Sequence, residues 1–236
     1  TWYAPQRREH AVPENNNIGM VEIYQHQFLW DNRMERRVYD AFVDIWDRED
    51  LWVSIDRANL NPPKRTAVQS SGFLHWDVDT SSRPLPRSAQ GVLSLTRQGG
   101  DLGGFQCVPG LFRDFEKWAK TQPANRDPFH PDVSGFEVEN VDLNPGDLLL
   151  FNSLLAHGVR ANRSASSVRM AQYITMFPGW WANTAYREER VREWREIDHP
   201  HEPPFPGDPR EWERQHNGGP AKLTPLGEKL LGLTRW

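Results

Sequence analysis

Three residues of types that bind metal ions stand at two separate places in the chain. His75 and Asp77 flank Trp76, and His157 follows the apolar segment 148–151 much later in the sequence. Side chains two apart on a β-strand point to the same face, so an imidazole and a carboxylate at positions 75 and 77 can bind one cation together. Two imidazoles and one carboxylate occupy one face of an octahedral Fe(II) ion and leave the opposite positions open. These residue types therefore predict a mononuclear metal centre.

A cationic side chain is the next candidate for chemistry. Arg169 opens the segment 169–175, which we predict to be a strand. Its planar guanidinium can bind the carboxylate of a small ligand through two parallel hydrogen bonds. Arg160 and Arg163 are rival candidates for this role, and a plain surface arginine is the alternative interpretation.

Other polar residues carry weaker signals. Gln106 and Tyr173 stand at alternating positions of predicted strands that can face a pocket, and we predict that both contact a bound cofactor. Asp79 can share the face of the metal ligands, but a surface role is the simpler interpretation. Cys107 has no evident partner base, so we interpret it as a buried small residue and not as a nucleophile. Two histidines in the segment 198–202 lack a third ligand, which favours a chance pairing.

Short β-strands must position these residues. Apolar or alternating segments recur between about residues 51 and 178, separated by turn signals such as Asn144-Pro145-Gly146-Asp147. Several short strands with such punctuation indicate a sandwich or a barrel. The predicted strands are 51–55, 73–77, 91–96, 105–108, 136–141, 147–152 and 169–177.

Helices are expected around these strands. A helix over 32–48 has Asp31 as its predicted cap, and its apolar face comprises Met34, Val38, Phe42, Ile45 and Trp46. A second helix is predicted over 111–120, and a solvated helix rich in Arg and Glu over 185–197. A closing helix begins near Pro225 with Thr224 as its cap.

Composition and length limit the class of protein. The 236 residues suit one domain over 1–236, with a core at about 51–178 and a C-terminal helical and irregular extension at 179–236. A net charge of −4 does not suggest a partner nucleic acid. No apolar run approaches the roughly 20 residues that span a bilayer, so no membrane partner is expected. A single cysteine allows no intrachain disulfide, and we expect a cytoplasmic protein.

Several motifs stand in a specific order along the chain. They are His-x-Asp at 75–77, Gly-Gly-Phe-Gln-Cys-Val-Pro-Gly at 103–110, Asn-Pro-Gly-Asp at 144–147, His-Gly at 157–158, and Arg169. Over about residues 54–177, this order resembles the phytanoyl-CoA dioxygenase family. The resemblance implies a mainly β protein with flanking helices, built on a double-stranded β-helix (jelly-roll, cupin-like) core.

The resemblance also implies an activity. His75, Asp77 and His157 match the family's iron-ligand positions, and Arg169 matches its cosubstrate-carboxylate position. The implied cofactor is Fe(II), with 2-oxoglutarate and O2 as cosubstrates and succinate and CO2 as products. Relatives that halogenate replace the carboxylate with a small residue, so Asp77 favours oxygen transfer. The expected reaction is oxidation, foremost hydroxylation, of a C–H bond in a small organic molecule.

Two other classes of function fit the same residues. One is a metal-dependent hydrolase or isomerase on a cupin-like barrel, and the other is a non-catalytic ligand-binding relative. Arg169 and the segment 103–110 favour the oxygenase over both. The substrate stays open, because lid loops and aromatic-rich ends set it in such scaffolds. The type of oxidation and the oligomeric state stay open as well.

Overall fold

The computed structural model describes residues 19–21, 23–63, 74–199 and 212–236. The chain divides into two compact units. We call residues 1–60, 91–93 and 171–236 the terminal unit, and residues 61–90 and 94–170 the central unit. The boundaries of a single domain with a core at 51–178 therefore stay a prediction. No helix in the described ranges is long and apolar enough to cross a membrane.

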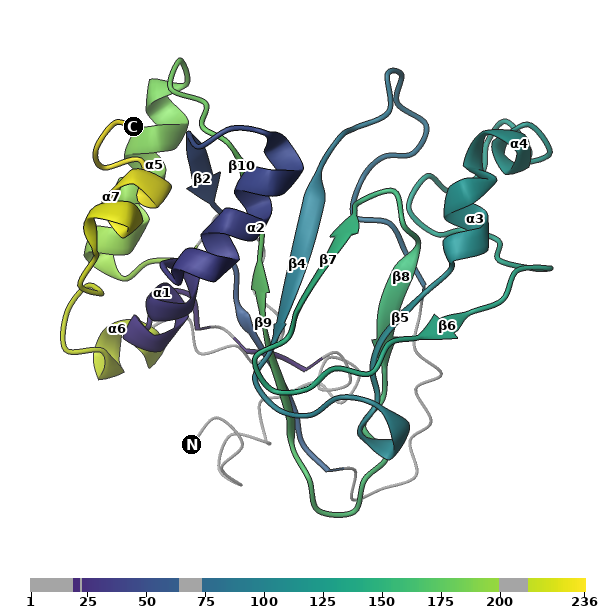
Figure 1. Cartoon of the computed structure of the whole chain (residues 1–236), viewed down its shortest axis with the longest axis horizontal. Helices are drawn as coiled ribbons and strands as arrows, with labels where there is room; N and C mark the ends of the chain where they lie inside the picture. Colours follow the sequence, from purple (N-terminus) through teal and green to yellow (C-terminus); the bar gives the residue numbers. More distant parts are fainter. Residues whose placement is uncertain (1–18, 22, 64–73, 200–211) are drawn as a thin grey trace. The chain divides into compact units, whose positions relative to one another are not determined.

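The terminal unit combines short antiparallel strand pairs with helices (Figure 1). Strand β1 pairs with β3, placing Met20 opposite Asn59, and β2 pairs with β10, placing Val53 opposite Met176. The elements that lie wholly or partly in this unit are β1 (Met20–Val21), α1 (Gln27–Arg33), α2 (Arg36–Trp46), β2 (Leu51–Val53), β3 (Ala58–Asn61), the middle of β4 (Ala89–Ser94), β9 (Arg169–Ile174), β10 (Met176–Pro178), α5 (Thr184–Glu196), α6 (Trp212–His216) and α7 (Pro225–Leu231).

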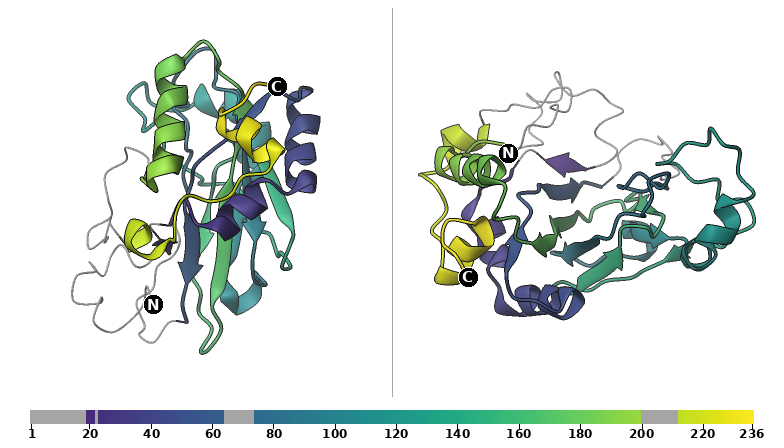
Figure 2. Two further views of the ribbon diagram at one scale, coloured as in Figure 1. Left: turned by 90° about the vertical axis from the view of Figure 1, so that its left-hand side faces the viewer. Right: turned by 90° about the horizontal axis from the view of Figure 1, so that it is seen from above.

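One buried arginine joins three elements of the terminal unit. Arg190 of α5 donates from Nη2 to the carbonyl oxygens of Val53 at 2.6 Å and Leu230 at 3.2 Å, and from Nε to that of Leu231 at 3.3 Å. Its guanidinium lies 5.3 Å from the centroid of the fully buried Trp52 ring. Arg190 thus connects α5 with β2 and with the end of α7. Figure 2 shows the helices α5 and α7 from two further directions.

The central unit is built mainly from antiparallel strands. Strand β5 lies between β6 and β8, with Gln106 opposite Asn140 on one side and Cys107 opposite His157 on the other. The elements that lie wholly or partly in this unit are the end of β3, both ends of β4, the 3-10 turn Gly100–Leu102, β5 (Gly104–Cys107), α3 (Pro109–Arg113), α4 (Phe115–Ala119), β6 (Glu139–Asn140), β7 (Leu148–Asn152), β8 (His157–Arg160) and the start of β9.

Glycine in the segment 103–110 has a steric reason. Gly103 has φ of 70°, and a Cβ at this position would collide with the carbonyl oxygens of Arg160 and Ala161. Only a residue without a side chain combines this conformation with such a close backbone approach. The motif therefore lets the chain enter β5 directly beside the end of β8.

The predicted mainly β architecture with flanking helices is confirmed at the level of antiparallel sheets and helices. Six of the predicted strands correspond to observed strands, although their ends differ by a few residues. The predicted strand 73–77 is wrong as a regular strand, because His75 forms only an isolated bridge. Phe73 lies outside the described residues. Strands β1, β3 and β8 were not predicted, because β1 has only two residues and the four-residue strands β3 and β8 contain few apolar side chains.

The predicted helix 32–48 is wrong at its start. The chain forms α1, which ends at Arg33, and then α2, which is capped by Glu35 through its contact with the Arg37 N–H at 3.4 Å. Asp31 lies inside α1, and Ile45 is 44% exposed, so neither has its predicted role. The helix predicted over 111–120 is likewise two short helices, α3 and α4. Helix α5 and the Thr224 cap of α7 are confirmed. The prediction that α5 is a solvated helix is wrong for one part of its surface, because Arg190, Val191 and Glu193 are buried.

Candidate metal centre

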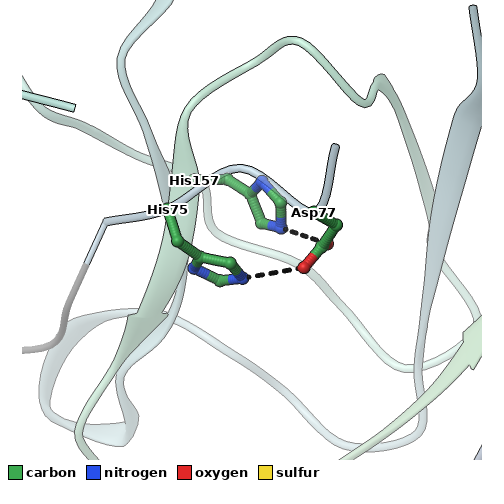
Figure 3. Close-up of side chains that lie close together, drawn as sticks. All are labelled: His75, Asp77 and His157. Atoms are coloured by element: carbon green, nitrogen blue, oxygen red, sulfur yellow. Dashed lines mark ion pairs between the residues drawn. The ribbon is translucent and has the colours of Figure 1, made fainter. Parts of the chain in front are cut away.

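The three predicted ligands come together in the central unit (Figure 3). His75 Nε2 lies 3.2 Å from Asp77 Oδ1, and His157 Nε2 lies 3.4 Å from Asp77 Oδ2. All the potential ligand atoms lie within 4.8 Å of one another. One carboxylate therefore faces two imidazoles, in a group small enough to surround a single cation.

Backbone pairing brings the two histidines to one face. His75 and His157 form an antiparallel bridge, with the N–H of His75 donating to the His157 carbonyl at 2.9 Å and the reverse bond at 3.0 Å. Directly opposite residues in such a pair carry their side chains on the same face. Their ring centroids are accordingly 4.6 Å apart. This pairing joins positions that are 82 residues apart, which no local sequence pattern predicts.

Trp76 anchors the segment between His75 and Asp77. Its side chain is 1% exposed, and its indole N–H donates to the Leu154 carbonyl at 2.8 Å. The ring packs edge-on against Phe115 at 5.8 Å and Trp118 at 5.6 Å between centroids. Because neighbouring side chains alternate, an inward Trp76 leaves the two flanking ligands on the other face. The shared face of His75 and Asp77 agrees with the prediction from their spacing.

His157 has a defined protonation pattern. Its Nδ1 lies 2.9 Å from the Leu155 carbonyl oxygen, which can only accept a hydrogen bond, so Nδ1 carries a proton. In the neutral ring, Nε2 then presents a lone pair toward Asp77. Phe105 stacks on this imidazole at 5.7 Å, and Phe151 lies at 4.6 Å, so His157 is buried and its ring is held in place.

Asp77 is the anion of the group. Burial acts to raise the pKa of its carboxyl, but the contacts with His157, His75 and Gln90 lower it by more, so that the pKa lies well below its ordinary value. Asp77 is therefore ionised at neutral pH. A carboxylate oxygen and an imidazole lone pair are both acceptors, so a positive charge belongs between them, either a proton on the ring or a metal ion. The donor set thus fits a divalent cation.

The comparison with known families is decisive for the class of protein. The sequence model for "Phytanoyl-CoA dioxygenase (PhyH)" matches residues 4–171, which include all three of these side chains. The chain belongs to the phytanoyl-CoA dioxygenase family. This membership supports an oxygenase activity and confirms the resemblance that the order of motifs indicated.

A curated fungal protein is similar to this chain in sequence. The "Ava biosynthesis cluster protein O" of Aspergillus versicolor is 28% identical over 168 residues, which make up 64% of this chain and 54% of that protein. The chain thus spans about half the length of this curated relative.

Two solved bacterial structures resemble this family member in fold. A putative oxidoreductase from Salmonella typhimurium LT2 gives a TM-score of 0.68 at 15% identity, covering 95% of this chain and 72% of its own. The hypothetical protein JW0805 from Escherichia coli gives a TM-score of 0.69 at 15% identity, covering 90% and 69%. At such low identity, these similarities show the fold alone.

Arg169, which matches the family's cosubstrate position, is 2% exposed at the start of β9. Its Nη1 lies 3.4 Å from Gln98 Oε1, and Gln98 Nε2 donates to Ser94 Oγ at 2.8 Å. All three side chains are buried. The role of Arg169 toward a carboxylate stays a prediction.

Gln106 and Tyr173, the two other residues predicted to contact a cofactor, do not share the strand face or the unit of His157. Gln106 pairs with Gly158, one residue beyond the Cys107–His157 pair, so alternation directs Gln106 to the other face of β5. Tyr173 is half-buried in β9 and belongs to the terminal unit. Both assignments stay predictions, and the register gives Gln106 no support. Of the rival arginines, Arg160 shares the face of Gln106, since it pairs with Gly104.

The weaker candidates have local roles. Asp79 accepts a hydrogen bond from the Ser81 N–H at 2.8 Å, which makes a turn, as its surface interpretation required. Cys107 is buried, and burial raises the pKa of its thiol, in accord with the predicted structural role. His199 lies 3.7 Å from Asp198, and His201 lies outside the described residues.

Gln90 was not among the residues predicted for the site. This residue of β4 donates from Nε2 to Asp77 Oδ2 at 2.7 Å. The available signal was weak: Gln90 is the one amide in the otherwise apolar or small segment Ala89-Gln90-Gly91-Val92-Leu93. A polar residue at such a position indicates a polar partner, but it does not identify that partner.

Proposed function

We propose that this protein is an Fe(II)- and 2-oxoglutarate-dependent dioxygenase with a double-stranded β-helix core. It oxidises, foremost by hydroxylation, a C–H bond of a small organic molecule and releases succinate and CO2. The observation that carries the proposal is the convergence of His75, Asp77 and His157 in a member of the phytanoyl-CoA dioxygenase family.

The ligand set suits iron. His75 Nε2, His157 Nε2 and a carboxylate oxygen of Asp77 would hold the ion, and two imidazoles with one carboxylate is the set typical of non-haem Fe(II) oxygenases. Bound iron supplies the oxidising chemistry with O2 and 2-oxoglutarate. The protein's own tasks are to bind, to orient and to keep water away. Phe105 and Phe151 serve the last task beside His157.

Arg169 is the residue we propose for the distal carboxylate of 2-oxoglutarate. A buried guanidinium attracts an anion more strongly than an exposed one, because less water screens the charge. Its planar fork matches a carboxylate in two parallel hydrogen bonds. Gln98 would hold the guanidinium in orientation without neutralising it, since an amide oxygen carries no net charge.

A test that needs no substrate follows from this arrangement. Anaerobic addition of Fe(II) and then 2-oxoglutarate to the full chain should produce the visible charge-transfer absorption of a keto acid chelated to iron. His157→Ala should abolish the absorption while circular dichroism shows an intact fold. An unchanged absorption in His157→Ala would remove this histidine from the centre.

The arginine requires its own variant. Arg169→Leu should weaken 2-oxoglutarate binding, measured by titration of the same absorption, and leave the affinity for Fe(II) unchanged. Arg163→Leu is the matched control, since Arg163 is exposed. Equal 2-oxoglutarate affinities in the two variants would contradict the proposed role of Arg169.

Turnover then separates the oxygenase from a hydrolase or isomerase. With candidate metabolites, succinate should form only when both O2 and Fe(II) are present. Product formation that continues at an unchanged rate without O2 would overturn the oxygenase proposal in favour of metal-dependent hydrolysis or isomerisation.

A further inference from the structure

The amide of Gln90 lies closer to the Asp77 carboxylate than the imidazole of either His75 or His157 does. Its Nε2 donates to Asp77 Oδ2 at 2.7 Å, whereas the imidazole nitrogens lie at 3.2 and 3.4 Å. The contact fixes the direction of the amide, because the opposite orientation would place two oxygens against each other. Gln90 comes from β4 and Asp77 from the irregular segment after the bridge, so the bond ties the ligand to a regular strand.

The other end of the same amide is unsatisfied. Gln90 Oε1 is buried and has no hydrogen-bond partner within the described ranges of the chain. A buried acceptor without a partner lowers stability, whereas an apolar side chain of similar size has no such cost. The flanking residues, Ala89 and Gly91, are small and buried. Stability therefore does not explain a glutamine at this position, but the bond to Asp77 does.

The neutrality of the amide also matters. A lysine or arginine in this place would pair with Asp77 and neutralise the charge that a metal ion requires. An amide donor orients the carboxylate and leaves its negative charge in place. It occupies Oδ2, so Oδ1, which faces His75 Nε2, is the oxygen without an amide partner.

We propose that Gln90 is a positioning residue for the metal centre. By holding Oδ2, it sets the rotation of the Asp77 carboxylate so that this group and the two imidazoles face one cation. The inference rests on the proposed function, since it assumes that these three side chains bind a metal ion. It adds a residue that acts through Asp77, as outer partners of ligating carboxylates generally do.

The decisive variant is Gln90→Leu, which keeps the approximate volume and removes both the donor and the unsatisfied acceptor. Anaerobic titration with Co(II), followed by its visible spectrum, should show affinity weaker by roughly 10- to 100-fold. The Tm of the metal-free protein should stay unchanged or rise. A purely structural glutamine would give the reverse pattern, with a lower Tm and unchanged affinity.

Ser88→Ala is the matched control. Ser88 precedes Gln90 by two residues and donates its hydroxyl to Ser153 Oγ at 2.6 Å. Its removal deletes a nearby hydrogen bond that does not involve Asp77, so the Co(II) affinity should equal that of the wild type. If Gln90→Leu does not fold, Gln90→Met, which is unbranched and still lacks a donor, replaces it with the same expected result.

The outcomes separate this inference from the proposed function. A wild-type protein that binds neither Co(II) nor Fe(II) would overturn both. A wild-type protein that binds Co(II), together with a folded Gln90→Leu or Gln90→Met variant of equal affinity, would overturn only the role of Gln90. Weaker binding in the variant with wild-type affinity in Ser88→Ala would establish it.

Discussion

Two polar clusters of this molecule differ in how their hydrogen-bond donors and acceptors are matched. In the terminal unit, the donors of Arg190 meet the carbonyl acceptors of Val53, Leu230 and Leu231. In the central unit, the Nε2 atoms of His75 and His157 face a carboxylate, so that atoms able to act as acceptors gather around one point. The first cluster is complete without a ligand, and the second has the composition of a cation site. Donor–acceptor matching therefore distinguishes a structural cluster from a binding site.

The largest expected effect is on metal binding. Asp77→Ala removes the anion between the two imidazoles, and Fe(II) affinity should fall by more than the roughly 100-fold that loss of an outer partner causes. Because the Asp77 side chain is 45% exposed, the free energy of unfolding of the metal-free protein should change by only about 1 kcal/mol or less. Anaerobic titration and urea unfolding measure the two quantities. A large loss of stability would show that this cluster is structural as well.

Arg190→Met should produce the opposite pattern. The substitution leaves three buried carbonyl oxygens without their donor, so we expect the free energy of unfolding to fall by about 3 kcal/mol or more. Urea unfolding followed by circular dichroism measures this loss. Arg187→Met, on the same helix but half-buried, is the control and should cost less. The affinity of the folded Arg190→Met fraction for Fe(II) should stay within about two-fold of the wild type.

Trp76→Phe tests whether a residue that stabilises the fold also affects the metal site. It keeps an aromatic ring against Phe115 and Trp118 but removes the donor to the Leu154 carbonyl. We expect a loss of about 1–2 kcal/mol in the free energy of unfolding. Since Trp76 lies between two ligands, Fe(II) affinity should also fall, by less than in Asp77→Ala. Stability loss with no change in affinity would mean that the ligands do not depend on this anchor.

The smallest effect concerns Cys107, which lies opposite His157 in the β5–β8 pair. Burial raises the pKa of its thiol, so the reactive thiolate forms at higher pH than in an exposed cysteine. Alkylation of the folded protein by iodoacetamide should therefore be slow at neutral pH and should accelerate only as pH rises toward that raised pKa. Fast alkylation at neutral pH in the folded state would contradict the buried placement. The urea-unfolded chain provides the rate of an accessible thiol.

Local chemistry made part of the structure predictable. Thr224 before Pro225 indicated the start of α7, because a hydroxyl cap and a proline at the first turn both favour a helix. The Arg- and Glu-rich run indicated α5. The break between α1 and α2 was not predictable in the same way, since Met34 and the segment after it fit the apolar periodicity of one continuous helix.

In the candidate site, too, the local features could be predicted from the sequence and the contacts between distant segments could not. The types of residue, two histidines and an aspartate, and the spacing of His75 and Asp77 were readable, because alternation along an extended chain is a local property. The bridge between His75 and His157, the stacking of Phe105 and the bond from Gln90 were not readable. Each of these joins segments that are distant in sequence, and their register depends on the burial of whole faces.

The sequence by itself thus determined the chemical inventory: which side chains can bind a cation, which can bind a carboxylate, and where helices such as α7 begin. The tertiary structure alone decided which donor meets which acceptor. It placed one carboxylate against two imidazoles and directed the Gln90 amide to Oδ2. The physical reason is that hydrogen bonds and ligand geometry act over about 3 Å, whereas the residues that make them are brought together only by strand pairing and packing.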